Sequence, residues 1–433
     1  MSIVDRLLQP KLRPPPASLI RMRSNAADEL KAFRSCLRWM GVDHSTSSTA
    51  ALSWTIFFAL NFAVPSISHF VLTFSPHRRP YDAALQLSLS SAAAVAFLCL
   101  SSAHQRYGLR RLLFVDELRR ESPRVHACYT AQLGGSFRIL SFLVAPSLVA
   151  EFAYKLWWYL AGSRRIPFLC HPAASDSVAF ALELASWTYR TAIFLLVCVL
   201  FRLICQLHIL RLEDFAAVFR EESEVEAVLR QHLRLKKQLR VTSHRFRSFI
   251  IACLVLVTAS QLTALFLATK HDADDRLFNT GELALCSITL VIGLLICLRS
   301  AAKITHKAQA LTSHAAKWHV CSTIDSFARD PETPCTIQIE EGDRNGVDDG
   351  DGEDEFYEEE AKSEDELEDT KLVHPQANTI SFQKRQALVT YFENNRAGIT
   401  IFGFVLDRAW LHTVCMLELT LFLWLLSKTI GIS

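Results

Sequence analysis

The sequence predicts an all-α integral membrane protein with seven transmembrane helices, its N-terminus inside the cell and its C-terminus outside. Half of the 433 residues are hydrophobic, and they gather in long runs. A helix needs about 20 mostly apolar residues to cross a hydrocarbon core of about 30 Å. Seven runs qualify: Ala50 to Phe74, Ala83 to Ser102, Phe137 to Gly162, Val178 to Leu207, Phe249 to Thr269, Gly281 to Leu298 and Ala397 to Ile430.

The positions of lysine and arginine predict the orientation. Eight of them precede the first run, nine lie in residues 208–248 and eleven in residues 299–396. The connections after the first, third and fifth runs carry two each. Positive charge near membrane ends is retained in the cytoplasm, so these basic segments are expected inside. An odd number of spans then places the C-terminus outside.

The segments between the runs predict the domain organisation. The cytoplasmic connections 103–136 and 208–248 have helical periodicity, either as continuations of the spans or as separately packed helices. Glu340 to Asp369 holds 17 acidic residues against two basic ones, and such a composition favours disorder across 330–378. The full division is a cytoplasmic segment 1–49, spans one to six in 50–300, a cytoplasmic connection 301–396, and a final helix 397–430 with a short inner part before the span.

Motifs exclude several classes of function. The sequence has no nucleophile elbow, Walker loop, zinc-protease motif or glycine-rich dinucleotide turn, so an enzyme, a cofactor and a nucleic-acid partner are not expected. No metal site is expected either, since the acidic run that resembles a calcium loop has Asp354 where a glycine is required. Ser363 precedes three acidic residues, which predicts a phosphorylation site.

Ionisable residues inside the predicted spans are candidate functional residues. An uncompensated charge at the bilayer centre costs about 2.5 to 3.5 kcal/mol or more. Glu151 and Lys155 are four residues apart and can pair on one helix face. Arg190 and Glu418 have no partner in their own helices, and they are expected either to pair with each other or to line a water-filled path.

The final segment, AGITIFGFVLDRAWLHTVCMLELTLFLWLLSKTIGIS, resembles the end of a plant family of uncharacterised membrane proteins described as gustatory-receptor-like. That family is regarded as distantly related to insect gustatory and odorant receptors. Those receptors are seven-helix, ligand-gated cation channels built as tetramers. The resemblance therefore implies a homo-oligomeric channel subunit, tetrameric by analogy, with a small-molecule ligand that the sequence does not identify.

An ungapped overlay on the insect co-receptor type assigns candidate pore residues. Its helix motif falls on positions where none of the four motif residues is present, and its pore side corresponds to Glu418, Phe422 and Leu425. A rival face needs no family comparison: Thr413, Thr420 and Ser427 repeat every seven residues as a small polar stripe. The Glu418 face is the one we favour on sequence alone.

Three function hypotheses follow from the sequence. The first is a ligand-gated or otherwise regulated cation channel subunit of the insect-chemoreceptor type. The second is a non-channel membrane adaptor or receptor whose acidic segment binds a basic partner, and the third is a secondary transporter, although no repeated halves are visible. Each hypothesis places the chain in a lipid bilayer, in the plasma membrane or in an endomembrane.

Overall fold

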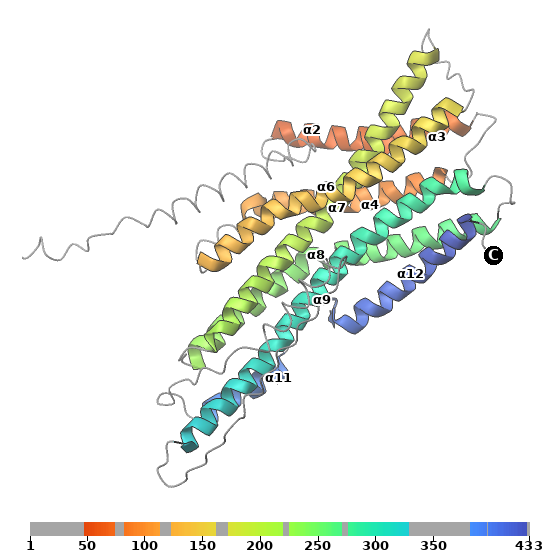
Figure 1. The fold of residues 1–433 in the computed structure, drawn as a ribbon. Helices are drawn as coiled ribbons and strands as arrows, with labels where there is room; N and C mark the ends of the chain where they lie inside the picture. The colour runs from red at the N-terminus through yellow and green to blue at the C-terminus, as the bar shows by residue number, and fades with distance from the viewer. Residues whose placement is uncertain are drawn as a thin grey trace, which may run out of the picture. The chain divides into compact units, whose positions relative to one another are not determined.

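The computed structural model describes residues 47–73, 82–112, 123–161, 172–219, 225–270, 276–328, 382–395 and 397–430 (Figure 1). Its elements are α2 Ser47–Phe58, the π-helix η2 Ala59–Ala63, α3 Val64–Thr73, α4 Asp82–Leu112, α6 Pro123–Ala161, α7 Pro172–Val218, α8 Val225–Lys270, α9 Arg276–Ala328, α11 Phe382–Asn394, β1 Thr400–Ile401, β2 Phe404–Val405 and α12 Arg408–Ile430. The predicted acidic segment 330–378 and Ser363 lie outside the described residues.

The predicted membrane-protein fold is confirmed: the described residues contain seven helices that are long and apolar enough to cross a bilayer. The first of them runs through α2, η2 and α3 without interruption. The spans differ in how far protein covers them: 83% of the most apolar window of α7 is buried, against 17% in α12. α7 is therefore a central helix, and most of the α12 surface is available to lipid or to another subunit. The orientation of the termini stays a prediction.

Contacts divide the chain into two units. Unit 1 comprises residues 1–211, 238–306 and 398–433, and unit 2 comprises residues 212–237 and 307–397. α7, α8 and α9 contribute residues to both units. The sequence left open whether the 208–248 connection continues the spans or forms a separate helix. In the structure α7 and α8 themselves extend through most of it as continuous helices.

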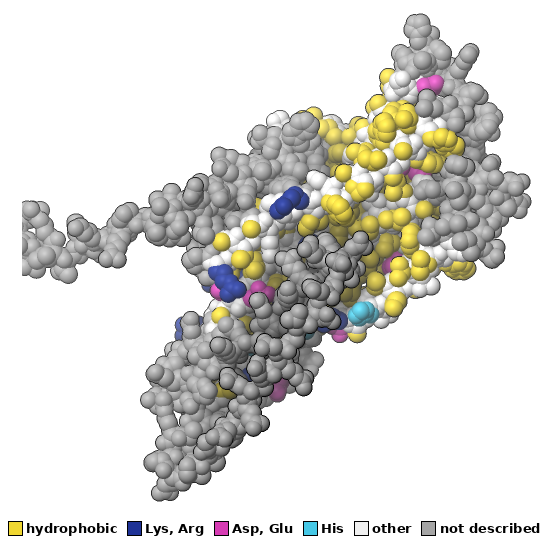
Figure 2. Space-filling model, in the orientation of Figure 1, with side chains coloured by type: hydrophobic (Ala, Val, Ile, Leu, Met, Phe, Trp, Pro, Cys, Tyr) yellow, Lys and Arg dark blue, Asp and Glu magenta, His cyan; other side chains and the backbone are white. Residues whose placement is uncertain are grey.

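Unit 1 is packed on the inside and apolar on the outside. Gly293 of α9 lies against Phe194 of α7, where a Cβ atom would come within 2.4 Å of the ring. A larger residue at this position would therefore require the Phe194 ring to shift. Outward-facing side chains of α6 such as Phe142 and Val149 are 78% and 67% exposed, and hydrophobic side chains cover much of its visible surface (Figure 2). An exposed apolar surface of this kind fits a lipid environment.

A π-helical turn in the first span frees backbone carbonyls for other helices. Pro65 has no N–H group, so it cannot bond to the preceding turn. Just before it, the carbonyl of Leu60 accepts a hydrogen bond from Ser186 Oγ at 2.6 Å. The carbonyl of Asn61 accepts one from Ser90 Oγ at 3.0 Å. The hydroxyls of α4 and α7 thereby satisfy carbonyls that the π turn exposes, as a membrane interior requires.

The predicted short inner helix at the start of segment 397–430 is wrong. Residues 400–405 form a β-hairpin instead, with Thr400 opposite Val405 and Ile401 opposite Phe404. Its turn residues Phe402 and Gly403 have positive φ angles of 47° and 95°. Two successive positive φ angles are what a tight hairpin turn needs, and glycine adopts the second without strain.

Unit 2 has an aromatic core of its own. The ring of His232 lies 4.6 Å from the ring of Phe392, measured between centroids. The ring of Phe219 lies 5.9 Å from that of Trp318. These contacts join α8 to α11 and the end of α7 to α9, which gives this unit a packing core built from four segments.

Candidate functional site

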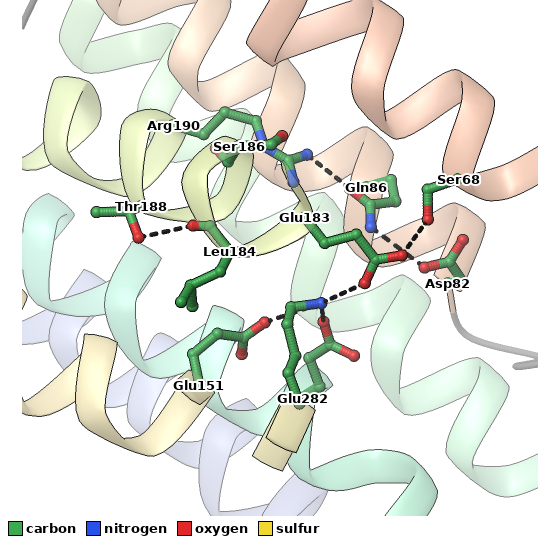
Figure 3. A network of polar contacts seen from close by, with 11 residues as sticks. Ser68, Asp82, Gln86, Glu151, Glu183, Leu184, Ser186, Thr188, Arg190 and Glu282 are labelled. Atoms are coloured by element: carbon green, nitrogen blue, oxygen red, sulfur yellow. Dashed lines mark hydrogen bonds and ion pairs between the residues drawn. The ribbon is translucent and has the colours of Figure 1, made fainter. Parts of the chain in front are cut away.

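A lysine on α6 lies among three carboxylates that come from three helices. The Nζ atom of Lys155 is 3.3 Å from Glu151 Oε1, 3.1 Å from Glu183 Oε2 and 3.3 Å from Glu282 Oε1. Figure 3 shows the three glutamate side chains converging on the point where these ion pairs meet. Together the four residues form the lysine cluster, and none of their side chains is more than 9% exposed.

The four residues of the lysine cluster come from three helices, α6, α7 and α9. Glu151 and Lys155 are four residues apart on α6, so they share one face of that helix. Glu183 comes from α7 and Glu282 from α9. A lone charge inside a spanning bundle is unfavourable, so these groups gain from meeting one another. The cluster therefore ties α6, α7 and α9 together.

Ser68 of α3 adds a neutral donor to the cluster. Its hydroxyl donates a hydrogen bond to Glu183 Oε1 at 2.5 Å, while the other oxygen of Glu183 accepts from Lys155 at 3.1 Å. Both oxygens of Glu183 thus have a donor, which is the arrangement expected for an ionised carboxylate.

Arg190 of α7 organises a second polar group beside the lysine cluster. Its Nη1 atom donates to Gln86 Oε1 at 2.7 Å and to Ser90 Oγ at 3.1 Å, and its Nε atom donates to the Ser186 carbonyl at 3.2 Å. Gln86 in turn donates to Asp82 Oδ1 at 3.2 Å. The Gln86 amide therefore connects the Arg190 guanidinium to an acidic residue at the start of α4 (Figure 3).

Glu418 of α12 lies in a different environment, which we name the α12 carboxyl site. Its side chain is 0% exposed, and its Oε1 atom lies 2.7 Å from Thr258 Oγ1 of α8. The one proton of this hydroxyl is shared between Glu418 and the Leu254 carbonyl, which lies at 2.8 Å. With its amide oriented to donate, Gln261 of α8 lies 3.1 Å from Glu418 Oε2 and 3.2 Å from the Glu418 carbonyl. Two neutral donors therefore connect α12 to α8.

The structure brings together only some of the residues that the sequence singled out. Glu151 and Lys155 face each other at 3.3 Å. Arg190 and Glu418 do not pair: Arg190 donates to α4 and to its own helix, whereas Glu418 accepts from α8. Among the described residues, the polar partners of Arg190 therefore differ from those of Glu418, and no contact between the two is found.

The residues favoured from the sequence as pore lining lie on the less exposed side of α12. Glu418 and Leu425 are 0% and 1% exposed within their own chain, and Phe422 is only partly exposed. Buried against its own subunit, a side chain is not available to line a path between subunits. The opposite face is the exposed one, and it contains Thr413 and Thr420.

Sequence reasoning missed Glu183 and Glu282. Both are acidic residues inside predicted apolar runs, at 178–207 and 281–298. That position was itself a usable signal, because an acid in a span requires a partner. Gln86 and Asp82 carried a weaker signal, since polar residues at the start of a span are common.

The chemistry available at the lysine cluster is the binding of positive charge. Three carboxyl groups and one ammonium would carry a charge of −2 if all were ionised, and they are buried among helices. Buried charges of this kind are stabilised only when they are paired and hydrogen-bonded. The α12 carboxyl site, by contrast, offers hydrogen-bond donors to its carboxylate.

Comparison with known proteins gives three findings. A family model described as a protein of unknown function, DUF3537, matches residues 28–417. No curated protein sequence matches the chain. A solved structure of the insect olfactory receptor OR5 from Machilis hrabei is similar at a TM-score of 0.49 and 12% sequence identity, covering 92% of this chain and 99% of that one.

Proposed function

The chain belongs to the DUF3537 family of proteins of unknown function, and the part that the structure describes contains seven helices able to cross a membrane; we propose that it is a subunit of a homo-oligomeric cation channel. The α12 helices of the subunits surround the pore. A small-molecule ligand and an assembly of four subunits are the expectations that accompany the resemblance of the final segment to gustatory-receptor-like proteins.

The exposed face of α12 is the observation that carries this proposal. The buried side of α12 is formed by Val414, Glu418 and Leu425. Thr413 and Thr420 are exposed, and at about 100° per residue they lie on the opposite side of the helix. The exposed face also contains apolar side chains such as Met416, which is 64% exposed, so the threonines form a polar stripe within an otherwise apolar face. A water-filled path is one environment that suits such a stripe.

Ser427 continues the stripe one heptad further along and is partly exposed. The hydroxyls of Thr413 and Thr420 donate to the carbonyls of Ala409 and Met416, at 3.0 and 2.7 Å. Each hydroxyl still has lone pairs that can accept from water or contact a cation. We therefore assign the pore lining to the Thr413, Thr420 and Ser427 face.

Cysteine modification tests the assignment directly. The full-length chain, with Cys415 replaced by serine to remove the nearby native thiol, is reconstituted in a planar bilayer as Thr420→Cys. A charged methanethiosulfonate reagent should reduce the cation current of this variant. Leu419→Cys is the matched control: Leu419 is 45% exposed but lies about 100° around the helix from Thr420, so its modification should leave the current largely unchanged.

Subunit counting by single-particle imaging tests assembly independently. Several copies arranged around a central α12 support the channel. A monomer that conducts no current would instead mean that lipid covers this face, and the non-channel adaptor would then be the better function.

The predicted topology has its own test. A tag placed after Ser433 should be accessible from outside intact cells or in the lumen of an internal compartment, whereas a tag at Met1 should be protected. Accessibility of both tags from the same side would contradict an odd number of spans.

A further inference from the structure

We propose that the hairpin at residues 400–405 is a membrane-interface anchor, whose apolar tip inserts into one leaflet and whose basic margin binds the phosphate groups of anionic phospholipids. The proposal does not depend on conduction by the protein or on its number of subunits. It rests on the exposed side chains of the hairpin, on its attachment to α8 and α9, and on the charge of the neighbouring part of α8.

The hairpin has one buried side and one exposed side. Ile401 and Leu406 are buried, whereas the phenylalanines at the turn, Phe402 and Phe404, are 60% and 72% exposed. Val405 is exposed as well. Several large apolar side chains exposed within one tight turn form a patch that contact with water does not favour. The tip therefore needs a cover from outside the chain.

The residue type at the tip does not suit the turn. Phe402 has a φ angle of 47° and Gly403 one of 95°. Asparagine followed by glycine is the pair that such two-residue hairpin turns favour, because both residues adopt positive φ angles readily. A phenylalanine is strained in this conformation. Its presence is not explained by the turn, and a strained residue of this kind points to a contact that the ring makes outside the chain.

Contacts with α8 give the direction of the hairpin. The Thr400 N–H donates to Ser243 Oγ at 3.1 Å, and the Arg247 guanidinium lies 4.8 Å from the centre of the Phe402 ring. Arg247 is one helical turn nearer than Ser243 to the apolar run that begins at Phe249. From its base to its tip, the hairpin thus approaches the hydrocarbon core.

The hairpin is also fixed to a second helix and continuous with a third. At its base the Ile399 N–H lies 3.4 Å from Thr305 Oγ1 of α9 and donates to it. The spanning helix α12 begins at Arg408, and Asp407 caps it by accepting a hydrogen bond from the Trp410 N–H at 3.0 Å. A chain spans at most about 3.6 Å per residue, so the tip lies close to the start of this helix. The attachment holds the tip at the membrane boundary.

The basic margin comes from α8 and from the first turn of α12. Between Arg230 and Arg247, α8 holds seven lysines and arginines and no acidic residue. Arg408 of α12 is exposed. A basic cluster of this size beside a span attracts anionic lipids, and arginine donates to phosphate in a fixed planar geometry. Arg247 donates to His244 Nε2 at 3.3 Å, and its guanidinium has further N–H groups that can reach a phosphate oxygen.

A lipid leaflet fits this surface better than a second copy of the chain does. Two copies that met through the same patch would bring their basic segments together, and like charges across an interface repel. A phospholipid offers acyl chains to the two rings and a phosphate group to Arg247 at neighbouring depths. Aromatic and basic side chains occur together at membrane interfaces for this reason.

Spin-label accessibility in the full-length protein tests the position of the tip. The chain carries a nitroxide at Phe404→Cys, after serine has replaced those native cysteines that react with the reagent, and is reconstituted in nanodiscs of phosphatidylcholine and phosphatidylglycerol. Oxygen, which dissolves in acyl chains, should relax the label, whereas a nickel chelate that stays in water should not. Phe142→Cys, on the exposed apolar face of α6, is the reference for acyl chains, and Leu233→Cys, exposed on the basic part of α8, is the reference for water.

The three possible results are distinct. Relaxation by oxygen, as at the Phe142 site, supports the anchor. Relaxation by the nickel chelate, as at the Leu233 site, would overturn the proposal because water would cover the tip. Protection from both reagents would also overturn it, because a protein surface such as a neighbouring subunit would then be the cover.

Thermal unfolding of the detergent-purified protein tests the lipid charge. Phosphatidylglycerol should raise the unfolding temperature more than phosphatidylcholine does, and high salt should reduce the difference. Arg247→Gln should also reduce it. Arg230→Gln is the matched control, because this exposed arginine lies further from the apolar run and pairs with Glu226. Its replacement should leave the difference between the two lipids nearly unchanged.

Phe402→Asn tests the tip without disturbing the fold. Asparagine suits the positive φ angle, so the unfolding temperature without lipid should stay the same or rise. Stabilisation by either lipid should nevertheless fall, because the ring that enters the leaflet is gone. If phosphatidylglycerol stabilised wild type, Arg247→Gln and Phe402→Asn equally, the hairpin would not be a lipid anchor.

Discussion

The lysine cluster and the α12 carboxyl site stabilise buried acids in different ways. Glu151 and Glu418 are both 0% exposed on spanning helices. Glu151 has an ammonium group at 3.3 Å, and neither of its oxygens accepts a hydrogen bond from the described residues. Glu418 accepts from Thr258 and is within reach of the Gln261 amide. One acid is thus held by charge and the other by neutral donors.

This difference has structural consequences. Charge acts in all directions, so one lysine can hold acids from α6, α7 and α9 at once. Hydrogen bonds are directional, so the donors of α8 fix a single contact with α12. The cluster is suited to holding several helices in one arrangement, and the α12 site to setting the rotation of one helix. In the proposed channel, that rotation decides which α12 face lines the pore.

Removal of the lysine should have the largest effect. Lys155→Met leaves three buried carboxyl groups without their central cation, which should destabilise the protein by about 3 to 5 kcal/mol. We expect a large loss of folded protein on size-exclusion chromatography and a lower unfolding temperature in detergent. Arg230→Met is the control, because the Arg230–Glu226 pair is exposed on α8 and should matter little. Equal behaviour of the two variants would show that the cluster contributes no net stability.

A double replacement tests whether the two sites are independent. Arg190→Gln weakens the contacts with Gln86 and Ser90, and Glu418→Gln alters the α12 site, so each should cost about 1 to 3 kcal/mol. Because they share no partner in the described residues, their effects on unfolding free energy should add within about 0.5 kcal/mol. A double variant more stable than either single variant would restore the direct pairing that the sequence suggested.

The sequence predicted more of the fold than of the sites. Seven spans follow from run length, which is a local property of the chain. The Glu151–Lys155 spacing is also local, and the structure places the two side chains face to face. Glu183 and Glu282 join them only through packing of α6, α7 and α9, which spacing within one helix does not report. The contact of Glu418 with α8 could not be predicted, because the overlay contains no information on which side of α12 packs on α8.

The hairpin at residues 400–405 was also not predicted, although it depends on residues that are close in the sequence. The sequence predicted a break near Gly403, and the structure has a tight turn there. The residues before the turn were predicted as helix because they are apolar and sit next to a long apolar run. Short apolar stretches do not distinguish strand from helix by periodicity alone.

The smallest effects are expected from removing one hydroxyl group at each site. The two changes compare an acid that keeps a nearby ammonium group with an acid that keeps only a neutral donor. Ser68→Ala removes the donor at 2.5 Å from Glu183, and Thr258→Val removes the donor at 2.7 Å from Glu418. Glu183 keeps Lys155 at 3.1 Å, whereas Glu418 keeps only a neutral amide among the described residues. Thr258→Val should therefore destabilise the protein by about 1.5 to 3 kcal/mol and Ser68→Ala by about 0.5 to 1.5 kcal/mol.

Both variants are compared by thermal unfolding in the same detergent, with Thr263→Val as a control for the substitution itself. Thr263 lies on an exposed face of α8 and its hydroxyl donates to its own helix at 2.7 Å, so this change should be nearly neutral. If Ser68→Ala proved as destabilising as Thr258→Val, the ammonium group of Lys155 would not be compensating for the lost donor. The acids of the lysine cluster would then depend on hydrogen bonds as much as Glu418 does, and the distinction between the two sites would fail.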